Sequence, residues 1–364
     1  MRQGDLILRI FYWNLVRITV WLGAWVMLTW VPAGTAGPPE FPITAQERES
    51  VIDSSLAQLR ELYVFPQTAA AMETAVRGRV SKGEYHSIVR GDELARKLTA
   101  DLHEVSHDEH LRIEYFPQGV PTATEGAPNG NDSKTQGGVA PENFGFTRME
   151  WLDGNVGYVE IREFLSSAEA EATASAALSF VASSDALIID LRRNIFGGDP
   201  EGIAYVLSYI FDEPTHVNDI HVRVGDRTVQ SWTLATVPGR RFGRGKPVYV
   251  LTSHDTFSGA EEFAYDVQAL KRALVIGEAT RGAAHMARPV PVSEHFVIRV
   301  PFAQAVNPVT HRNWDDTGVI PDKVAPAARA LEVAYRLALE GLIAATDDVE
   351  RRKRLQSLLS SKER

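Results

Sequence analysis

The residues around Ser258 could carry nucleophilic chemistry. An apolar run at 248–251 predicts a strand, and the residues from Gly259 to about Lys271 predict a helix. A serine between such a strand and helix lies at the carboxyl edge of a sheet, where backbone N–H groups of the first helical turn point towards the group that its hydroxyl attacks. Gly259 would let a substrate carbonyl approach this backbone closely. The arrangement is suited to acyl transfer.

The same spacing also has a purely structural interpretation. Ser258 and Glu261 stand three residues apart at a predicted helix start, which is the spacing of a capping box. In that interpretation both side chains only satisfy backbone groups of the first helical turn, although Glu261 could also orient the site. Spacing alone favours the cap, so the hypothesis of a nucleophile needs further support.

The composition limits the chemistry and the partners. The chain has 364 residues, of which 44% are hydrophobic and 23% charged, as in ordinary globular proteins. It contains no cysteine, so a thiolate nucleophile, a disulfide framework and a thiolate metal site are excluded. A formal net charge of −9 argues against a nucleic-acid partner. No metal or organic cofactor is indicated, and catalysis would depend on oxygen and nitrogen groups.

Longer runs around Ser258 resemble a known family. The runs TFSGAEEFAY at 256–265 and VIGEATRGA at 275–283 are similar to peptidase family S41, which includes C-terminal-processing proteases, the tricorn protease core and the interphotoreceptor retinoid-binding protein modules. Three further runs are similar to the same family in the expected order, at 63–66, 106–111 and 318–322. The resemblance spans about 60–325. It implies an α/β (α+β) core of the crotonase-like ClpP type, in which Ser258 is the nucleophile.

The chain departs from the family pattern at the partner of Ser258. Processing proteases of the family pair the nucleophile with a lysine 25 residues later, and that position is Ala283 here. The resemblance therefore favours the branch in which a histidine and a carboxylate complete the site, with His110 as the base. The carboxylate would be Asp315, where the family has a glutamate three residues before its Gly-Val-x-Pro-Asp motif. His107 and His285 remain alternative bases, and His285 could also be a pocket residue.

Two details bear on whether this site is complete. Aspartate is one methylene shorter than glutamate, so Asp315 reaches a histidine only if the backbone shifts. The resemblance also implies that backbone N–H groups of Gly259 and Gly198 stabilise the oxyanion. The glycine turn that contains Gly198 is preceded by Ile195 and Phe196, which look like a one-residue insertion relative to the family. The insertion could alter the donor geometry or place an apolar side chain in the pocket.

The N-terminal half of the chain predicts helices that precede the core. Residues 40–110 predict a small helical bundle, with helices that begin at Thr44, Pro66 and Asp92. A strand follows over 111–115, with His110 at its beginning, and a polar flexible linker completes the segment 111–143.

Strands and helices alternate over the predicted catalytic core at 144–330. The continuous apolar run at 186–191 indicates a strand that is buried on both faces of a sheet. A C-terminal helix and a basic tail are predicted at 331–364. No PDZ domain is apparent, because the segment between the first strand and the core is short and polar.

The first 36 residues are predicted to be a secretory signal peptide. Three arginines precede an apolar run of about 14 residues at 18–31, and small residues follow at 33–36. An uncleaved membrane anchor is the alternative, although the run is shorter than the roughly 20 residues that span a bilayer. Without residues 1–36 the net charge would be −11, because their three arginines outweigh one aspartate. We expect an exported protein, with membrane contact only if the segment stays uncleaved.

These patterns predict a secreted or periplasmic serine-type peptidase. It would hydrolyse peptides or unfolded-protein substrates through a Ser-His-acid arrangement rather than a Ser-Lys pair. The alternative is a catalytically weak or inactive protein that binds a small hydrophobic ligand or peptide on the same scaffold. Ala283, Asp315 and the insertion at 195–196 motivate this alternative, together with the retinoid-binding members of the family.

Overall fold

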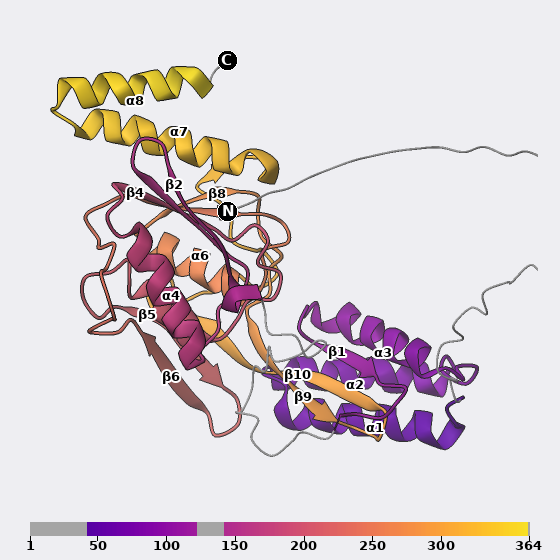
Figure 1. The fold of residues 1–364 in the computed structure, drawn as a ribbon. Helices are drawn as coiled ribbons and strands as arrows, with labels where there is room; N and C mark the ends of the chain where they lie inside the picture. Colours follow the sequence, from indigo (N-terminus) through magenta and orange to yellow (C-terminus); the bar gives the residue numbers. More distant parts are fainter. Residues whose placement is uncertain (1–41, 122–141, 363–364) are drawn as a thin grey trace, which may run out of the picture. The chain divides into compact units, whose positions relative to one another are not determined.

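The computed structural model describes residues 42–121 and 142–362. The predicted signal peptide at 1–36 lies outside these residues, as does most of the predicted linker. Within the described ranges, three N-terminal helices precede a mixed α/β core, which confirms the predicted fold class (Figure 1).

The three N-terminal helices form as their capping and spacing predict. They are α1 (Ala45–Leu62), α2 (Pro66–Ser81) and α3 (Gly91–Ser106). Thr44 Oγ1 accepts the backbone N–H of Glu47 at 3.1 Å, so the predicted N-cap of α1 is confirmed. Three leucines along one face of α3 are fully buried, namely Leu94, Leu98 and Leu102, and burying one leucine contributes about 2 kcal/mol. The helices therefore share one apolar core with the strands they cover.

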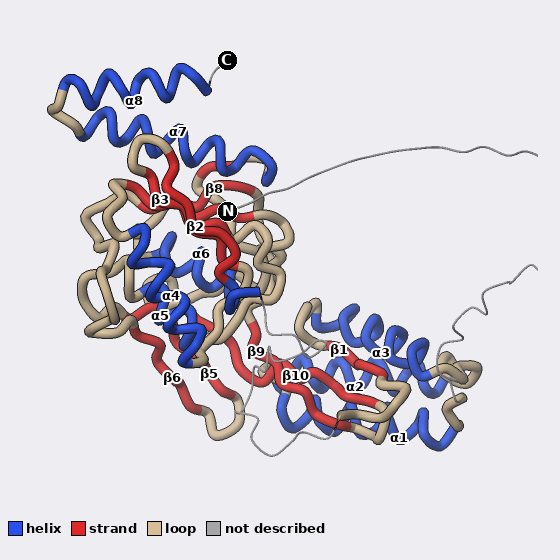
Figure 2. Tube along the Cα trace, in the orientation of Figure 1, coloured by secondary structure: helices blue, strands red, loops and turns tan. Residues whose placement is uncertain are grey.

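An antiparallel sheet connects these helices to the rest of the fold through one long strand, β10 (Phe296–Val306). One end of β10 pairs with β1 (Arg112–Tyr115), and the other pairs with β5 (His216–Val222). The remaining strands are β6 (Arg227–Trp232), which pairs with β5, and β9 (His285–Pro291), which forms a hairpin with β10 (Figure 2). Both the helical region and the core thus bury parts of the same strand.

Strands β5, β6, β9 and β10 of this sheet were not predicted from the sequence, and prolines explain this for β9 and β10. Pro289 and Pro291 lie in β9, and Pro301 lies in β10 where the pairing register shifts. Proline cannot donate to a ladder and normally indicates an edge strand or a bulge, so these segments do not resemble ordinary strands.

The second sheet forms the predicted α/β core. Its strand order is β11-β8-β7-β4-β3-β2, and all neighbours are parallel except β2 and β3. The strands are β2 (Phe146–Leu152), β3 (Val156–Ile161), β4 (Ala186–Asp190), β7 (Val248–Thr252), β8 (Leu274–Gly277) and β11 (Lys323–Val324), and a 3-10 turn at Glu142–Gly145 precedes β2.

Helices cover both faces of the core sheet, as the apolar run of β4 predicts. Leu187 and Ile189 pack in the cluster that contains α4 (Ala168–Val181), α5 (Pro200–Leu207) and α6 (Gly259–Ala269). Ile188 packs on the opposite face against α7 (Ala327–Ala345) (Figure 1).

One local prediction differs from the structure. The basic run at 351–354 is not a tail but part of helix α8 (Val349–Lys362), because Leu355 is buried and contacts the apolar cluster around α7. Among the described residues, no helix is long and apolar enough to cross a membrane.

Candidate active site

Ser258 lies at the turn between β7 and α6, as predicted. Its backbone has φ 52° and ψ −119°, a conformation that non-glycine residues rarely adopt. Such local strain persists only where surrounding contacts impose it, and it is concentrated at functional sites. The strained turn brings the start of α6 next to Gly197, in the segment that follows β4.

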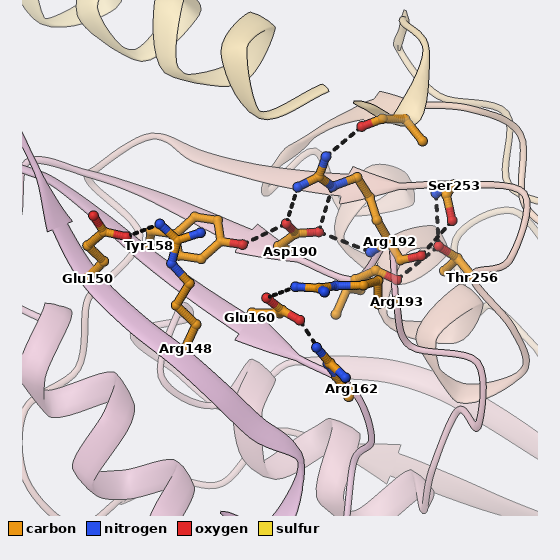
Figure 3. Close-up of polar contacts among 12 residues, drawn as sticks. Arg148, Glu150, Tyr158, Glu160, Arg162, Asp190, Arg192, Arg193, Ser253 and Thr256 are labelled. Carbon is orange, nitrogen blue, oxygen red and sulfur yellow. Dashed lines mark hydrogen bonds and ion pairs between the residues drawn. The ribbon is translucent and has the colours of Figure 1, made fainter. Parts of the chain in front are cut away.

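Hydrogen bonds to the end of β4 hold the turn in place. Ser253 Oγ donates to the carbonyl of Arg192 at 2.6 Å, and Thr256 Oγ1 donates to that of Leu191 at 3.0 Å. The Arg192 side chain in turn donates to both carboxylate oxygens of Asp190, which also accepts from Tyr158 (Figure 3). The carboxyl edge of the sheet is therefore a fixed support for the nucleophile turn.

Glu261 forms the carboxylate half of the predicted capping box and also braces a second loop. Its Oε2 accepts the Ser258 N–H at 2.8 Å. It further accepts from the Thr280 hydroxyl at 2.6 Å and from the backbone N–H groups of Gly282 at 2.6 Å and Ala283 at 3.1 Å. Burial raises the pKa of Glu261 to about 7, against the effect of these four donors. Glu261 thus orients the site without reaching the Ser258 hydroxyl.

His110 contacts the Ser258 hydroxyl. Its Nε2 lies 3.0 Å from Ser258 Oγ, within the range required of a base and its nucleophile. The ring packs against Phe257 with centroids 4.8 Å apart. Burial lowers the pKa of His110 to about 4, and the negative charge of Asp108 only partly opposes this effect. The imidazole is therefore neutral near pH 7 and able to accept a proton.

Asp315 does not make the hydrogen bond to His110 that the sequence predicts. Its Oδ1 accepts the N–H of Ala284 at 3.1 Å, and its Oδ2 lies 3.4 Å from His285 Nε2. The Nδ1 atom of His110 is buried and has no hydrogen-bond partner among the described residues. The short aspartate side chain and the presence of His285 account for the difference, since His285 is the histidine that Asp315 reaches.

His285 contacts a carboxylate that sequence reasoning did not assign to the site. Its Nδ1 lies 2.7 Å from Asp108 Oδ2, which also accepts the Tyr63 hydroxyl at 3.0 Å. Asp108 Oδ1 accepts the backbone N–H of His110 at 3.0 Å. Asp108 and Tyr63 lie in the runs 106–111 and 63–66 that carry the family resemblance, which was the available signal for them. The resemblance identified the segments but not these roles.

The glycine turn lies directly against Ser258. A Cβ added at Gly197 would lie 2.8 Å from Ser258 Cβ and 2.6 Å from Gly259 N, so a side chain there would collide with the site. Asn194 Oδ1 accepts the N–H of Gly197 at 2.8 Å, and Gly198 forms a parallel bridge with Phe164. These contacts fix the turn that carries Gly198 beside Gly259.

The two residues at the apparent one-residue insertion in this turn are exposed to solvent. Ile195 is 46% exposed and Phe196 is 58% exposed, so neither side chain is buried in the core. Within the described ranges, no group of three or more histidine or acidic side chains is placed to hold a metal ion.

Comparisons with known proteins agree with this architecture. Residues 155–325 match the model of peptidase family S41, and residues 44–142 match that of the N-terminal domain of Peptidase S41 in eukaryotic IRBP. The chloroplastic carboxyl-terminal-processing peptidase 2 of Arabidopsis thaliana is 30% identical over 182 residues, which are 47% of this chain and 32% of that protein. The match therefore spans about one third of the length of this relative.

Two solved structures share the fold at low sequence identity. A candidate peptidase from Parabacteroides merdae has a TM-score of 0.56 and 18% identity, covering 80% of this chain and 96% of the other. A lipoprotein from Streptococcus agalactiae has a TM-score of 0.54 and 14% identity, covering 83% of this chain and 97% of the other.

Proposed function

This chain belongs to peptidase family S41, and we propose that it is a serine-type peptidase in which Ser258 and His110 hydrolyse peptide bonds without a lysine partner. The observation that carries the proposal is the 3.0 Å contact between His110 Nε2 and Ser258 Oγ. The strained backbone of Ser258 and the low pKa of His110 support it, because both suit a nucleophile with a neutral base.

The proposed reaction proceeds through an acyl-enzyme. Ser258 Oγ attacks the amide carbonyl while His110 Nε2 takes its proton, and the backbone N–H group of Gly259 stabilises the oxyanion. His110 then gives the proton to the leaving amine. Water attacks the acyl-enzyme in the same way and releases Ser258. The Ser258 N–H is not the donor in this scheme, because it already bonds to Glu261.

We propose peptides or unfolded segments of proteins as the substrates. The Arabidopsis relative is named as a carboxyl-terminal-processing peptidase, which places polypeptides among the substrates of a related chain. In an extended polypeptide the amide carbonyls are not hydrogen-bonded within the chain, so one of them can approach a nucleophile at the edge of a sheet. A folded substrate keeps most of its carbonyls in internal hydrogen bonds.

A binding protein without turnover is the second candidate. One observation favours it, namely the buried Nδ1 of His110, for which the described residues offer no hydrogen-bond acceptor of the kind that normally holds the tautomer of a catalytic histidine. In this case Ser258 would contribute to binding a small hydrophobic ligand or a peptide, and the chain would cleave neither.

The test combines covalent labelling with peptide cleavage. Wild-type protein, Ser258→Ala and Ser293→Ala are incubated with a fluorophosphonate probe and with a library of unstructured peptides. Ser293 lies in the turn between β9 and β10 and serves as the matched serine control. The peptidase proposal expects labelling and cleavage by wild type and Ser293→Ala, and neither by Ser258→Ala. If wild-type protein shows neither labelling nor cleavage, the peptidase proposal is wrong and the binding function is favoured.

Export remains part of the proposal. It rests on the arginines, the apolar run and the small residues at 1–36. Mass spectrometry of the N-terminus of protein recovered from cells tests it. Cleavage near residue 36 is expected, and an intact Met1 on protein in the cytoplasm would contradict export.

A further inference from the structure

His285 is a buried histidine held between two carboxylates. Its Nδ1 lies 2.7 Å from Asp108 Oδ2, and its Nε2 lies 3.4 Å from Asp315 Oδ2. The side chain is only 2% exposed, so bulk water does not solvate the ring. The Nδ1 contact is a hydrogen bond in which the ring donates, because an ionised carboxylate can only accept. The Nε2 contact is an ion pair only when the ring carries a second proton, so the arrangement suits an imidazolium ion.

The charges around the ring favour this protonated form. Burial alone would lower the pKa of His285, but the hydrogen bond and charge of Asp108, with the charges of Asp315 and Asp316, raise it overall. Burial would likewise raise the pKa of Asp108, yet its contacts with His285 hold that pKa below the usual range. Burial raises the pKa of Asp315, and the charge of His285 opposes the rise.

Asp108 connects this ion pair to the base. Its Oδ2 is held by His285 and by the hydroxyl of Tyr63, while its Oδ1 accepts the backbone N–H of His110 at 3.0 Å. The carboxylate is 1% exposed, so these donors replace its solvation. The position of the His110 backbone, from which the ring reaches Ser258, therefore depends on a carboxylate that needs a neighbouring positive charge.

We propose that His285 is a positioning residue whose protonated ring holds Asp108, and through Asp108 holds His110 against Ser258. This role rests on the proposed function, and it differs from that of an alternative base because His110 is the ring that contacts Ser258 Oγ. It also gives the site a buried positive charge two positions after Ala283, where the lysine of the family pattern is missing.

The proposed role of His285 predicts a distinctive pH profile of kcat/KM. The limbs that distinguish this proposal come from His110, which must be neutral, and from His285, which must be protonated. Glu261, whose pKa burial raises to about 7, titrates between these limbs in wild type and variant alike. Burial lowers the pKa of His110 to about 4. The charge of Asp108 opposes this shift, and the charges of His285, Arg112 and Arg299 add to it. The acidic limb of the profile therefore lies near pH 4. The alkaline limb follows the loss of the proton from His285, whose pKa lies above 6.5.

Removing the imidazole of His285 should change both the acidic and the alkaline limb of the pH profile. In His285→Gln the alkaline limb disappears, because no group that titrates there remains beside Asp108. The acidic limb moves to higher pH, because Asp108 without a neighbouring cation keeps its proton to higher pH. Near neutral pH we expect a fall in kcat/KM of about 10-fold or more, with KM nearly unchanged.

The experiment measures kcat/KM from pH 4 to pH 10 for wild type, His285→Gln and His216→Gln. His216 forms a similar pair with Asp219, at 2.8 Å on β5, and serves as the matched control. The control should keep both limbs. A profile of His285→Gln that is lowered uniformly, with both limbs in their wild-type places, would overturn the proposal, as would complete loss of probe labelling in a folded variant.

A second measurement does not depend on the stability of the variant. The ring of His285 is followed by nuclear magnetic resonance in the intact wild-type protein as a function of pH. The proposal expects an imidazolium at pH 7, and a neutral ring at that pH would overturn it. Failure of the proposed function itself would be recognised separately, as wild-type protein that the fluorophosphonate does not label.

Discussion

The two sides of the site are built in different ways. The nucleophile side is assembled by a strand, a turn and a helix that follow one another along the chain, and Ser258 and Glu261 are only three residues apart. The base side brings together Tyr63, Asp108, His285 and Asp315, and the contact between His285 and Asp108 joins residues 177 positions apart. The nucleophile therefore depends mainly on local structure, whereas the base depends on the completed tertiary fold.

The largest expected effect comes from removing the base itself. In His110→Ala the hydroxyl of Ser258 loses its proton acceptor, and we expect kcat/KM to fall about 10³-fold at pH 7. The midpoint of thermal unfolding, measured alongside, should change little relative to this loss. A variant that keeps more than a tenth of the wild-type rate would show that another group accepts the proton.

The next effect tests the nucleophile side through stability. In Glu261→Gln the new amide group faces backbone donors of the 282–283 loop or of Ser258, and at least one buried donor loses its acceptor. We expect the free energy of unfolding to fall by about 2–3 kcal/mol in urea titrations. Glu332→Gln, on the exposed surface of α7, is the matched control and should change stability by less than about 0.5 kcal/mol.

A smaller effect tests the base side through the pH dependence of thermal stability. Because the pKa of His285 is raised above 6.5 in the folded protein, its stabilising contribution is fully present below pH 6.5 and is lost as the pH rises through the folded-state pKa. The midpoint of thermal unfolding of wild type should therefore fall between pH 6 and pH 9, by on the order of a few °C more than that of His285→Gln. Equal pH dependence in the two proteins would contradict a charged His285.

The smallest effect is expected at the inserted turn. Phe196 is 58% exposed, so Phe196→Ser should change the free energy of unfolding by less than about 0.5 kcal/mol. Gly197→Ala, one position later, provides the contrast, because its Cβ would collide with Gly259 N. Differential scanning calorimetry of the two variants would test whether the insertion is tolerated because its side chains are exposed to solvent.

The contrast between local structure and tertiary fold also explains which features the sequence could predict. The strand at 248–252, the helix from Gly259 and the position of Ser258 between them follow from local periodicity and turn chemistry, and the structure contains them. The role of Asp315 was inferred from a motif position, and the inference missed because nothing in the sequence near 315 indicates that His285 intervenes. Strands β9 and β10 were missed because their prolines obscure the alternation of a ladder.

The shared strand β10 also decides how the chain can be divided. The matched family regions end and begin at 142 and 155, which suggests a natural boundary there. Yet β1, which follows His110 closely, forms its ladder with residues 296–299, and the opposite end of the same strand forms its ladder with β5. A fragment that begins at this boundary would keep the nucleophile, lose the base and leave one edge of β10 unpaired and open to aggregation. The two regions therefore form a single unit of folding, and separating them at the boundary would also separate His110 from Ser258.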